Sequence, residues 1–596
     1  MHNKKNTLLG NAWFLTRYAF RINRKVYWSQ IPMILVNAVT PFITILFYRF
    51  ILNEITISKN VEKAMLYMVI MVVLLFLSTV FKSQCGRTLQ RQIELTVNKI
   101  KRNLGLAVMQ LEYSEVETPR VRDFVELAKN GANFSGILDA ISTIISSTIT
   151  LAGVITIILM IQPIVLLFAA LVGLFQLLSD KMNQRLWGKY KDRFAFLFRK
   201  IHYYSRIMSA AEFGKEVRLN NLQKWIYQRS DVKMDERIAL QTKYNFKLQC
   251  NGLPTTIVTV VEIIVILFFL VYKFYNDQFP IGDFTMYLTS VLTFTSCVSA
   301  ITTSISSIMQ TGLFANDFRY CIEEAQASTT QQNNITSAHP TALNKDEGAI
   351  IEFKNVSFKY PNTDRLILKN ISLKIYNGES LSIVGANGAG KTTIVKLLCR
   401  LYKPTEGEIL FNGVNIQTIE KEQYAQYIGA VFQDFKLFSF SVSENIAFDE
   451  ELKSQKAWFC LEKSGLKQKI EQLPEGINTT INKEFDSNGI EFSGGEGQKL
   501  AMARTLYKDA PIIILDEPTA ALDPIAEYEM YTKFDEITKG KTAIYISHRL
   551  SSCQFCDKIA VLEDGKIAQY GNHKELVMQS GPYAKMWNMQ AKYYVG

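Results

Sequence analysis

Six long apolar stretches in the first half of the chain constrain its fold more than any other feature. A helix needs about 20 apolar residues to cross the hydrocarbon core of a bilayer. Backbone polar groups in that core must pair within the chain, so each stretch is predicted to be a membrane-spanning helix. The predicted spans are residues 27–52, 62–82, 136–160, 162–182, 253–273 and 284–312. The third and fourth are separated only by Gln162 and Pro163, which predicts a tight hairpin.

The basic residues belong to this apolar half. Residues 1–348 carry 37 Lys and Arg against 24 Asp and Glu, whereas residues 349–596 carry 29 against 31. Basic side chains gather in segments 83–135 and 183–250, and the connections 53–61 and 274–283 are short and nearly neutral. The positive-inside rule therefore places the long loops and both termini in the cytoplasm. Attraction to anionic lipid explains this distribution better than nucleic-acid binding, so no nucleic-acid partner is expected.

Four segments are predicted. Residues 1–26 form a basic cytoplasmic segment, which no small-residue cleavage site follows, so it is not a cleaved signal peptide. Residues 27–322 hold the six spans and long cytoplasmic loops that read as helical. Residues 323–348 are rich in Gln, Thr, Asn and Ala without periodicity, which is typical of a linker. Residues 349–596 alternate strand-like and helical runs, as an α/β domain does.

A glycine-rich segment of the α/β domain matches the pattern G-x-x-x-x-G-K-[ST]. Its glycines let the backbone turn so that successive N–H groups face nucleotide phosphates. Lys391 is expected to reach the β- and γ-phosphates, and the Thr392 hydroxyl suits Mg²⁺. The predicted phosphate-binding residues are Gly385, Asn387, Gly388, Gly390, Lys391, Thr392 and Thr393.

A second feature lies further along the chain. Residues 512–515 are a short, unbroken apolar run, as expected of a buried parallel strand. Asp516 ends this run, where its carboxylate suits Mg²⁺ held through water, and Glu517 follows.

With these motifs, residues 349–596 resemble an ABC ATPase, and the whole chain resembles a half-size ABC exporter. The resemblance implies an all-α six-helix transmembrane domain followed by an α/β P-loop ABC ATPase domain with a helical subdomain. In their amino-acid sequence, segments 212–219 and 546–557 are most similar to bacterial exporters of lantibiotic and bacteriocin peptides. Only 26 residues precede the first span, and they hold no cysteine. A leader-cutting cysteine protease is therefore not expected there, and a peptide cargo should be leaderless or cut elsewhere.

The resemblance also implies roles for individual residues. Tyr360 stacks on adenine, Gln433 senses Mg²⁺, Glu517 is the catalytic base and His548 is the γ-phosphate switch. The signature and the D-loop are Ser493, Gly494, Gly495, Glu496 and Asp523, and the metal-binding residues are Thr392, Gln433 and Asp516. Three residues depart from the family pattern, because Glu496 stands where Gln is usual, Ser487 where Glu is familiar and Ala520 where Ser is common.

The family arrangement sandwiches ATP between Lys391 of one subunit and Ser493 of another, so two chains are required. We therefore expect a homodimer, or a pair with a paralogous half-transporter, that uses ATP and Mg²⁺ to export a peptide across the cytoplasmic membrane. Multidrug efflux and flipping of a lipid or lipid-linked glycan are alternatives within the same class. A soluble ribosome-associated ABC ATPase would lack spans, and an uptake system would usually carry them on separate chains.

Three features allow two interpretations each. Glu262 falls near the middle of the fifth span, where a carboxylate suggests a cargo site but could instead bond a neighbouring helix. A polar stripe on the sixth span suits either helix packing or a wet cavity; it comprises Thr295, Ser299, Thr302, Ser306 and Gln310. Cys553 and Cys556 form a lone CxxC pair, more typical of ordinary thiols than of a metal or redox site.

Overall fold

The computed structural model describes residues 7–117, 134–159, 164–277, 280–333, 349–361, 363–449, 452–517, 538, 540–547 and 550–595. Contacts divide the chain into two compact units. The first comprises Met1–Met109 and Arg122–Glu324, and the second comprises Gln110–Val121 and Ala325–Gly596.

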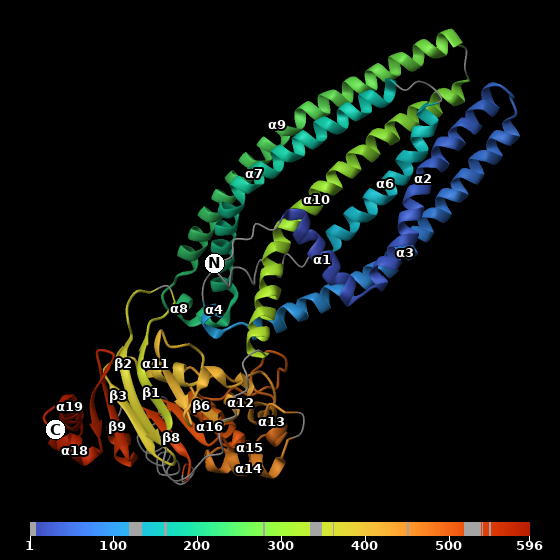
Figure 1. Ribbon diagram of the computed structural model, residues 1–596. Helices are drawn as coiled ribbons and strands as arrows, with labels where there is room; N and C mark the ends of the chain where they lie inside the picture. Colours follow the sequence, from blue (N-terminus) through green and yellow to red (C-terminus); the bar gives the residue numbers. More distant parts are fainter. Residues whose placement is uncertain are drawn as a thin grey trace. The chain divides into compact units, whose positions relative to one another are not determined.

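Every secondary-structure element among the described residues of the first unit is a helix (Figure 1). Its elements are α1 (Leu8–Ile22), α2 (Lys25–Thr56), α3 (Val61–Gln110), α6 (Ser135–Leu159), α7 (Ile164–Ser209), η1 (Ala211–Phe213), α8 (Gly214–Leu219), α9 (Gln223–Asp277) and α10 (Ile281–Asn333). Within the described ranges, five helices are long and apolar enough to cross a membrane, namely α2, α3, α6, α9 and α10. The predicted fourth span falls on α7, while the predicted hairpin at Gln162 and Pro163 lies outside the described residues.

Helices α3, α7, α9 and α10 continue far beyond their apolar stretches. Helix α3 has 50 residues, which corresponds to about 75 Å at 1.5 Å per residue. The predicted helical character of the long loops is therefore confirmed where they are described. Helix α10 also continues to Asn333, so the first residues of the predicted linker are helical, and residues 334–348 lie outside the described part.

Helix α1 was not predicted. Its Leu15 and Ala19 are fully buried. Asn11 donates a hydrogen bond to Asn316 of α10 at 3.2 Å, and the Asn23 amide that follows the helix donates to Thr96 of α3 at 3.0 Å. The basic residues of this segment conceal a narrow apolar stripe, which only helical geometry brings onto one face.

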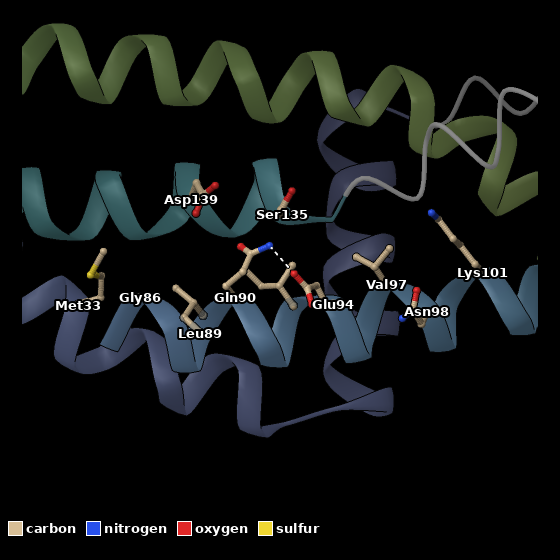
Figure 2. A pocket seen from close by; sticks show the side chains of 11 residues that line it. Met33, Gly86, Leu89, Gln90, Glu94, Val97, Asn98, Lys101, Ser135 and Asp139 are labelled. Carbon is tan, nitrogen blue, oxygen red and sulfur yellow. Dashed lines mark hydrogen bonds between the residues drawn. The ribbon is translucent and has the colours of Figure 1, made fainter. Parts of the chain in front are cut away.

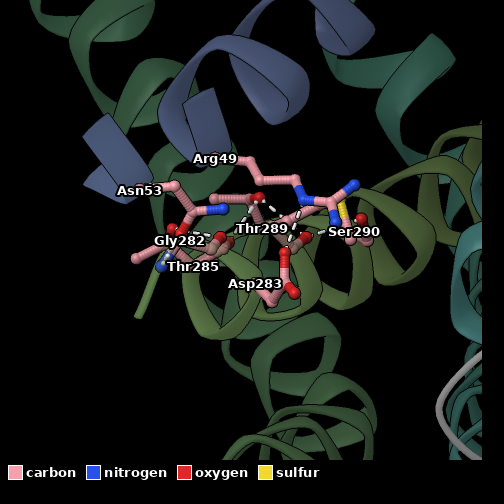
Figure 3. A network of polar contacts seen from close by, with 8 residues as sticks. Arg49, Asn53, Gly282, Asp283, Thr285, Thr289 and Ser290 are labelled. Atoms are coloured by element: carbon pink, nitrogen blue, oxygen red, sulfur yellow. Dashed lines mark hydrogen bonds and ion pairs between the residues drawn. The ribbon is translucent and has the colours of Figure 1, made fainter. Parts of the chain in front are cut away.

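Polar contacts join the C-terminal end of α2 to the N-terminal end of α10 (Figure 3). Arg49 forms an ion pair with Asp283, and the Gly282 N–H donates to the Asn53 side chain at 3.1 Å. A Cβ atom on Gly282 would lie 2.3 Å from Asn53 Oδ1 and 2.5 Å from the Arg49 carbonyl oxygen. Glycine therefore permits the close approach of the two helices here.

Glu262 lies in the contact between α9 and α10. Its side chain is 1% exposed, and Thr295 donates to its Oε1 atom at 3.1 Å. Ile266 and Val291 belong to the apolar cluster beside it. This arrangement favours the interpretation in which the carboxyl group bonds a neighbouring helix. The Thr295 hydroxyl of the polar stripe serves this α9–α10 contact. Ser306 of the same stripe lies beside Asp180 of α7 instead.

The second unit contains two sheets. An antiparallel sheet has the order β2-β1-β4-β5, and a mostly parallel sheet has the order β10-β9-β3-β8-β7-β6. The strands are β1 (Ala349–Phe358), β2 (Leu368–Tyr376), β3 (Ser380–Gly385), β4 (Glu406–Phe411), β5 (Val414–Asn415), β6 (Ile428–Val431), β7 (Ile512–Asp516), β8 (Thr542–Ile546), β9 (Lys558–Glu563) and β10 (Lys566–Gly571). Strands β3 and β7 both pair in parallel with β8. Their carboxyl ends, Gly385 and Asp516, therefore meet at one edge of the sheet, where α/β folds bind ligands.

Helices complete this unit and divide its interior into separate cores. The helices are α4 (Tyr113–Val116), α11 (Lys391–Leu398), α12 (Lys421–Gln426), α13 (Val442–Ala447), α14 (Ser454–Lys463), α15 (Lys467–Glu471), α16 (Gly494–Lys508), α18 (His573–Met578) and α19 (Pro582–Val595), with short turns η2 (Ile416–Thr418), η3 (Gly476–Asn478) and η4 (Leu550–Phe555). One core packs β1 to β4 against α11, and a second packs α13 to α16 against β6 and β7. The second core is the predicted helical subdomain.

Candidate nucleotide-binding site

The glycine-rich loop between β3 and α11 has the backbone that its sequence predicted. Gly388 and Gly390 have φ angles of 80° and 106°, in the region that favours glycine. Gly385 has a φ of 154°, and a Cβ atom there would lie 2.2 Å from the Leu562 carbonyl oxygen. Residues with a side chain rarely adopt the positive φ angles of Gly388 and Gly390, and a side chain at position 385 would overlap the neighbouring strand β9. The loop therefore needs these glycines.

Lys391 begins α11 and folds back over the loop. Its ammonium group donates to the carbonyl oxygens of Gly385 at 2.8 Å and Ala386 at 3.0 Å. The side chain is 5% exposed, and this burial lowers the pKa of Lys391, while Glu517 and Asp516 act in the opposite direction. A buried ammonium group held by neutral carbonyls is well placed to exchange them for phosphate oxygens.

Asp516 lies at the end of β7 and is 1% exposed. Neither of its carboxylate oxygens has a close hydrogen-bond partner within the described ranges, although Thr392 lies beside it. Burial, and then the charge of Glu517, raise the pKa of Asp516 to about 6. A buried carboxylate in this state is costly without a cation. The oxygens of Asp516 and Thr392 are the hard ligands that Mg²⁺ prefers, so these residues fit that ion.

Glu517 occupies an unusual backbone position. Its φ angle is 51°, which residues other than glycine seldom adopt, and its N–H donates to the Ile546 carbonyl at 3.0 Å. Gln433 donates to the Glu517 carboxylate at 2.8 Å, and Gln498 donates to the Glu517 carbonyl at 3.1 Å. Such strain persists where surrounding contacts enforce it, and it is concentrated at functional sites. The contacts hold the carboxylate beside the predicted magnesium position.

Tyr360 joins the antiparallel sheet to the phosphate loop. Its hydroxyl shares a hydrogen bond of 3.1 Å with Thr393, and the Lys396 ammonium lies 5.6 Å from the centre of its ring. A cavity of about 360 Å³ borders the ring, with Tyr402 and Lys403 on its wall. The ring therefore lies next to the phosphate loop, and its contact to adenine stays a prediction.

Segment 110–121 clusters with this unit and contributes to the same cavity through Glu112 and Ser114. Tyr402 donates a hydrogen bond to Glu117, and Lys403 forms an ion pair with Glu112. The rings of Tyr402 and Tyr360 meet edge to face at 5.3 Å. Tyr402 therefore contacts both Tyr360, at the predicted adenine site, and Glu117, in a segment that lies between the second and third predicted spans in the sequence.

The predicted signature begins α16. Ser493 is the N-cap residue, and its hydroxyl accepts from the Glu496 N–H at 3.3 Å. Glu496 accepts in return from the Ser493 N–H at 2.9 Å and from its hydroxyl at 3.0 Å. This reciprocal pair is a capping box, which either Glu or Gln can form. The backbone hydrogen bond from Ser493 lowers the pKa of Glu496, which keeps it ionised.

The structure thus gathers Tyr360, Lys391, Gln433, Asp516 and Glu517 around one sheet edge. The contacts described for Ser493 are with Glu496 and none reaches Lys391 within the described residues. Asp523 and His548 lie outside the described residues, and so no geometry is assigned to them.

Some side chains of the site were not predicted. Gln498, which is 2% exposed, and Tyr402 act through contacts that depend on tertiary packing, and no motif of the sequence marked either residue. Cys553 was predicted to be an ordinary thiol, and it is buried beside Ser382 at 3.3 Å. The eight cysteines, which all lie in described residues, form no disulfide bond. The described residues also hold no group of three or more His, Cys, Asp and Glu side chains that could bind a metal ion.

Comparison with known proteins agrees with this geometry. Residues 368–520 match the ABC transporter family. The chain is 29% identical to the subtilin transport ATP-binding protein SpaT of Bacillus subtilis, over 95% of this chain and 92% of that protein. A solved bacterial Atm1-family ABC exporter with ATP bound shares its fold, with a TM-score of 0.79, 22% identity and coverage of 95% of this chain and 98% of that one.

Residues 368–520 therefore form an ABC transporter domain, and the chain has the fold of an ABC exporter. It hydrolyses ATP to drive export across a membrane, and its ATPase domain is cytoplasmic. Half-size ABC exporters generally act as dimers. The exporter is also 36% identical to an ATP-dependent lipid A-core flippase of Haemophilus influenzae, in a match that spans 53% of this chain and 52% of that protein.

Proposed function

We propose that this exporter acts as a homodimer and moves a peptide out across the cytoplasmic membrane. The assignment of a peptide as the cargo rests on the similarity to a subtilin transport protein, which extends over 95% of this chain and 92% of that protein. The likeness to a lipid A-core flippase spans only about half of each protein, and therefore it supports the lipid alternative less well. Multidrug efflux has no comparable observation in its favour.

In the proposed cycle, each ATP lies between Lys391 of one subunit and Ser493 of the other. Mg²⁺ would be held by Thr392, Gln433 and Asp516, and when bound it would neutralise charge on the β- and γ-phosphates. Glu517 would orient and polarise the attacking water, because its carboxylate lies beside the phosphate loop and is fixed by Gln433.

His548 is proposed to be the γ-phosphate switch and Asp523 to belong to the D-loop, as the family pattern implies. The proposed segments also stay as predicted, with residues 27–322 as the transmembrane domain and residues 349–596 as the ATPase. Residues 1–26 and 323–348 are the cytoplasmic N-terminal segment and the linker.

Transport in proteoliposomes would test this proposal. Exporter reconstituted with the ATPase facing outward should accumulate a fluorescent amphipathic peptide in the lumen when ATP and Mg²⁺ are supplied. The Glu517→Gln variant is the matched control, because it should bind ATP without sustaining transport. Accumulation of a labelled lipid in the opposite leaflet, with no uptake of any peptide, would overturn the peptide assignment and favour the flippase alternative.

A further inference from the structure

A second cavity lies in the first unit, between α2, α3 and α6 (Figure 2). Its volume is about 660 Å³, within the range of small-molecule sites. Met33 and Leu89 give it an apolar floor, and Gln90 and Glu94 point from α3 toward α6. Asp139 faces them from α6. An apolar floor with a few convergent polar groups is the usual composition of a ligand site.

The cavity lies where the spans meet the cytoplasmic loop. Its α3 residues begin at Gly86, just after the predicted span 62–82, and continue to Lys101. Asp139 lies in the second turn of α6, which begins at Ser135. Carboxylates at this depth remain close to water, and so they avoid the large cost of a charge at the bilayer centre. A ligand could therefore reach the cavity from the cytoplasm.

The charges of the cavity are not balanced internally. Glu94 accepts a hydrogen bond from Gln90 at 3.0 Å, which leaves its negative charge in place. Within the described part of the chain, no ion pair engages either Glu94 or Asp139. Lys101 lies at the far end of the wall, two helical turns beyond Glu94. The charged side chains that line the cavity are therefore two carboxylates, from facing helices, and one ammonium group, and their net charge favours a cation over an anion.

We propose that this cavity binds a cationic side chain of the peptide cargo, with its ammonium or guanidinium group between Glu94 and Asp139. Neighbouring apolar side chains of the cargo would pack on Met33 and Leu89. This inference rests on the proposed peptide export, and adds to it that the cargo is a cationic amphipathic peptide. An anionic lipid headgroup does not suit the site, because two carboxylates would face its phosphate.

Binding to the full-length dimer in nanodiscs of zwitterionic lipid would test the charge of the ligand. The probe is a short fluorescent peptide of alternating Lys and Leu, and its twin carries Gln in place of Lys. The wild-type protein should prefer the Lys peptide. The double variant Glu94→Gln with Asp139→Asn should lose about tenfold in affinity for it, as expected from two partly exposed ion pairs. Glu62→Gln, a change at the opposite end of α3, is the control.

A variant that fills the cavity gives an independent test. A Cβ atom on Gly86 meets nothing within 4 Å, so Gly86→Leu should extend into the space without a clash. Helix α3 should not be weakened, since leucine favours helix more than glycine does. Gly105→Leu is matched to it, because Gly105 lies on the same helix, has equally open surroundings and does not line the cavity. Gly86→Leu should weaken binding of the Lys peptide at least about fivefold, as expected when a binding surface is blocked, while basal ATP hydrolysis and Gly105→Leu stay at the wild-type level.

Three results would overturn the inference: equal affinity of the wild-type protein for both peptides, wild-type affinity in the double variant, or equal loss in Gly86→Leu and Gly105→Leu. Equal export of the Lys peptide by the wild type and the double variant would also reject the cavity while leaving peptide export intact. Charge-selective binding with no peptide transport in proteoliposomes would instead reject the proposed function alone.

Discussion

The capping box at the signature makes a quantitative prediction for Glu496. Glu496→Ala removes the acceptor of the Ser493 N–H and hydroxyl, at 2.9 and 3.0 Å. Loss of a helix cap costs typically about 1 kcal/mol. The ion pair with Lys469, at 3.4 Å and half exposed, adds only a few tenths of that. In a domain of this size the sum should lower the melting temperature of the ATPase by about 3–5 °C.

The same change should affect nucleotide use. Ser493 would lose the partner that fixes its hydroxyl, so the KM for ATP should rise about fivefold if roughly 1 kcal/mol of preorganisation is lost. Glu496→Gln should keep the cap, because its amide oxygen can accept from the Ser493 N–H, and it should stay near the wild type in both measurements.

The assay is thermal unfolding of the full-length protein in detergent, followed by ATPase kinetics at 25 °C. Glu475→Ala is the control, since Glu475 is exposed in the same helical subdomain and makes no capping hydrogen bond. If Glu496→Ala matched that control in melting temperature and KM, the capping argument would be refuted. A Gln variant as damaged as the Ala variant would show that the charge, and not the cap, matters.

Four further predictions concern the ATP site and two contacts between membrane helices. Glu517→Gln should hydrolyse ATP at least about 100-fold more slowly and accumulate as a closed ATP-bound dimer, and near-normal turnover in a purified sample would contradict its role as the base. Mixed dimers that pair a Ser493→Arg subunit with a Lys391→Ala subunit should keep one intact ATP site and retain some ATPase activity. If every mixed dimer is inactive, crosslinking Ser493 to the phosphate loop of the other subunit should show whether the two subunits share the ATP sites. A crosslink would then mean that both sites must act together, and its absence would refute the shared site. Gly282→Ala should destabilise the α2–α10 contact by about 1–3 kcal/mol, because the new methyl overlaps Asn53 Oδ1 and the Arg49 carbonyl, and an unchanged melting temperature would show that the helices separate freely there. Glu262→Gln should leave transport unchanged because its amide oxygen can still accept from Thr295, whereas lost transport at a normal melting temperature would return this residue to the cargo path.

The chemistry of the site was largely predictable from the sequence. Backbone amides that cradle phosphate require glycine at fixed spacings, and a buried parallel strand requires an unbroken apolar run, so both motifs are visible in the residues themselves. The sequence therefore predicted that Lys391, Thr392 and Asp516 serve one nucleotide. The spans were predictable for a similar reason, since the hydrocarbon core demands about 20 apolar residues in a row.

Packing decided the rest, because contacts between distant residues leave no local pattern. The apolar face of α1 was hidden among basic residues, and Glu262 could be placed in a helix contact only once α9 and α10 were paired. The strained backbone of Glu517, with φ at 51°, depends on Gln433 and Gln498 from other elements. The departure at Glu496 acquired its explanation only from the N-cap geometry of Ser493. Likewise, Glu94 and Asp139 are 45 positions apart in the sequence, and only the facing of α3 and α6 places them around one cavity.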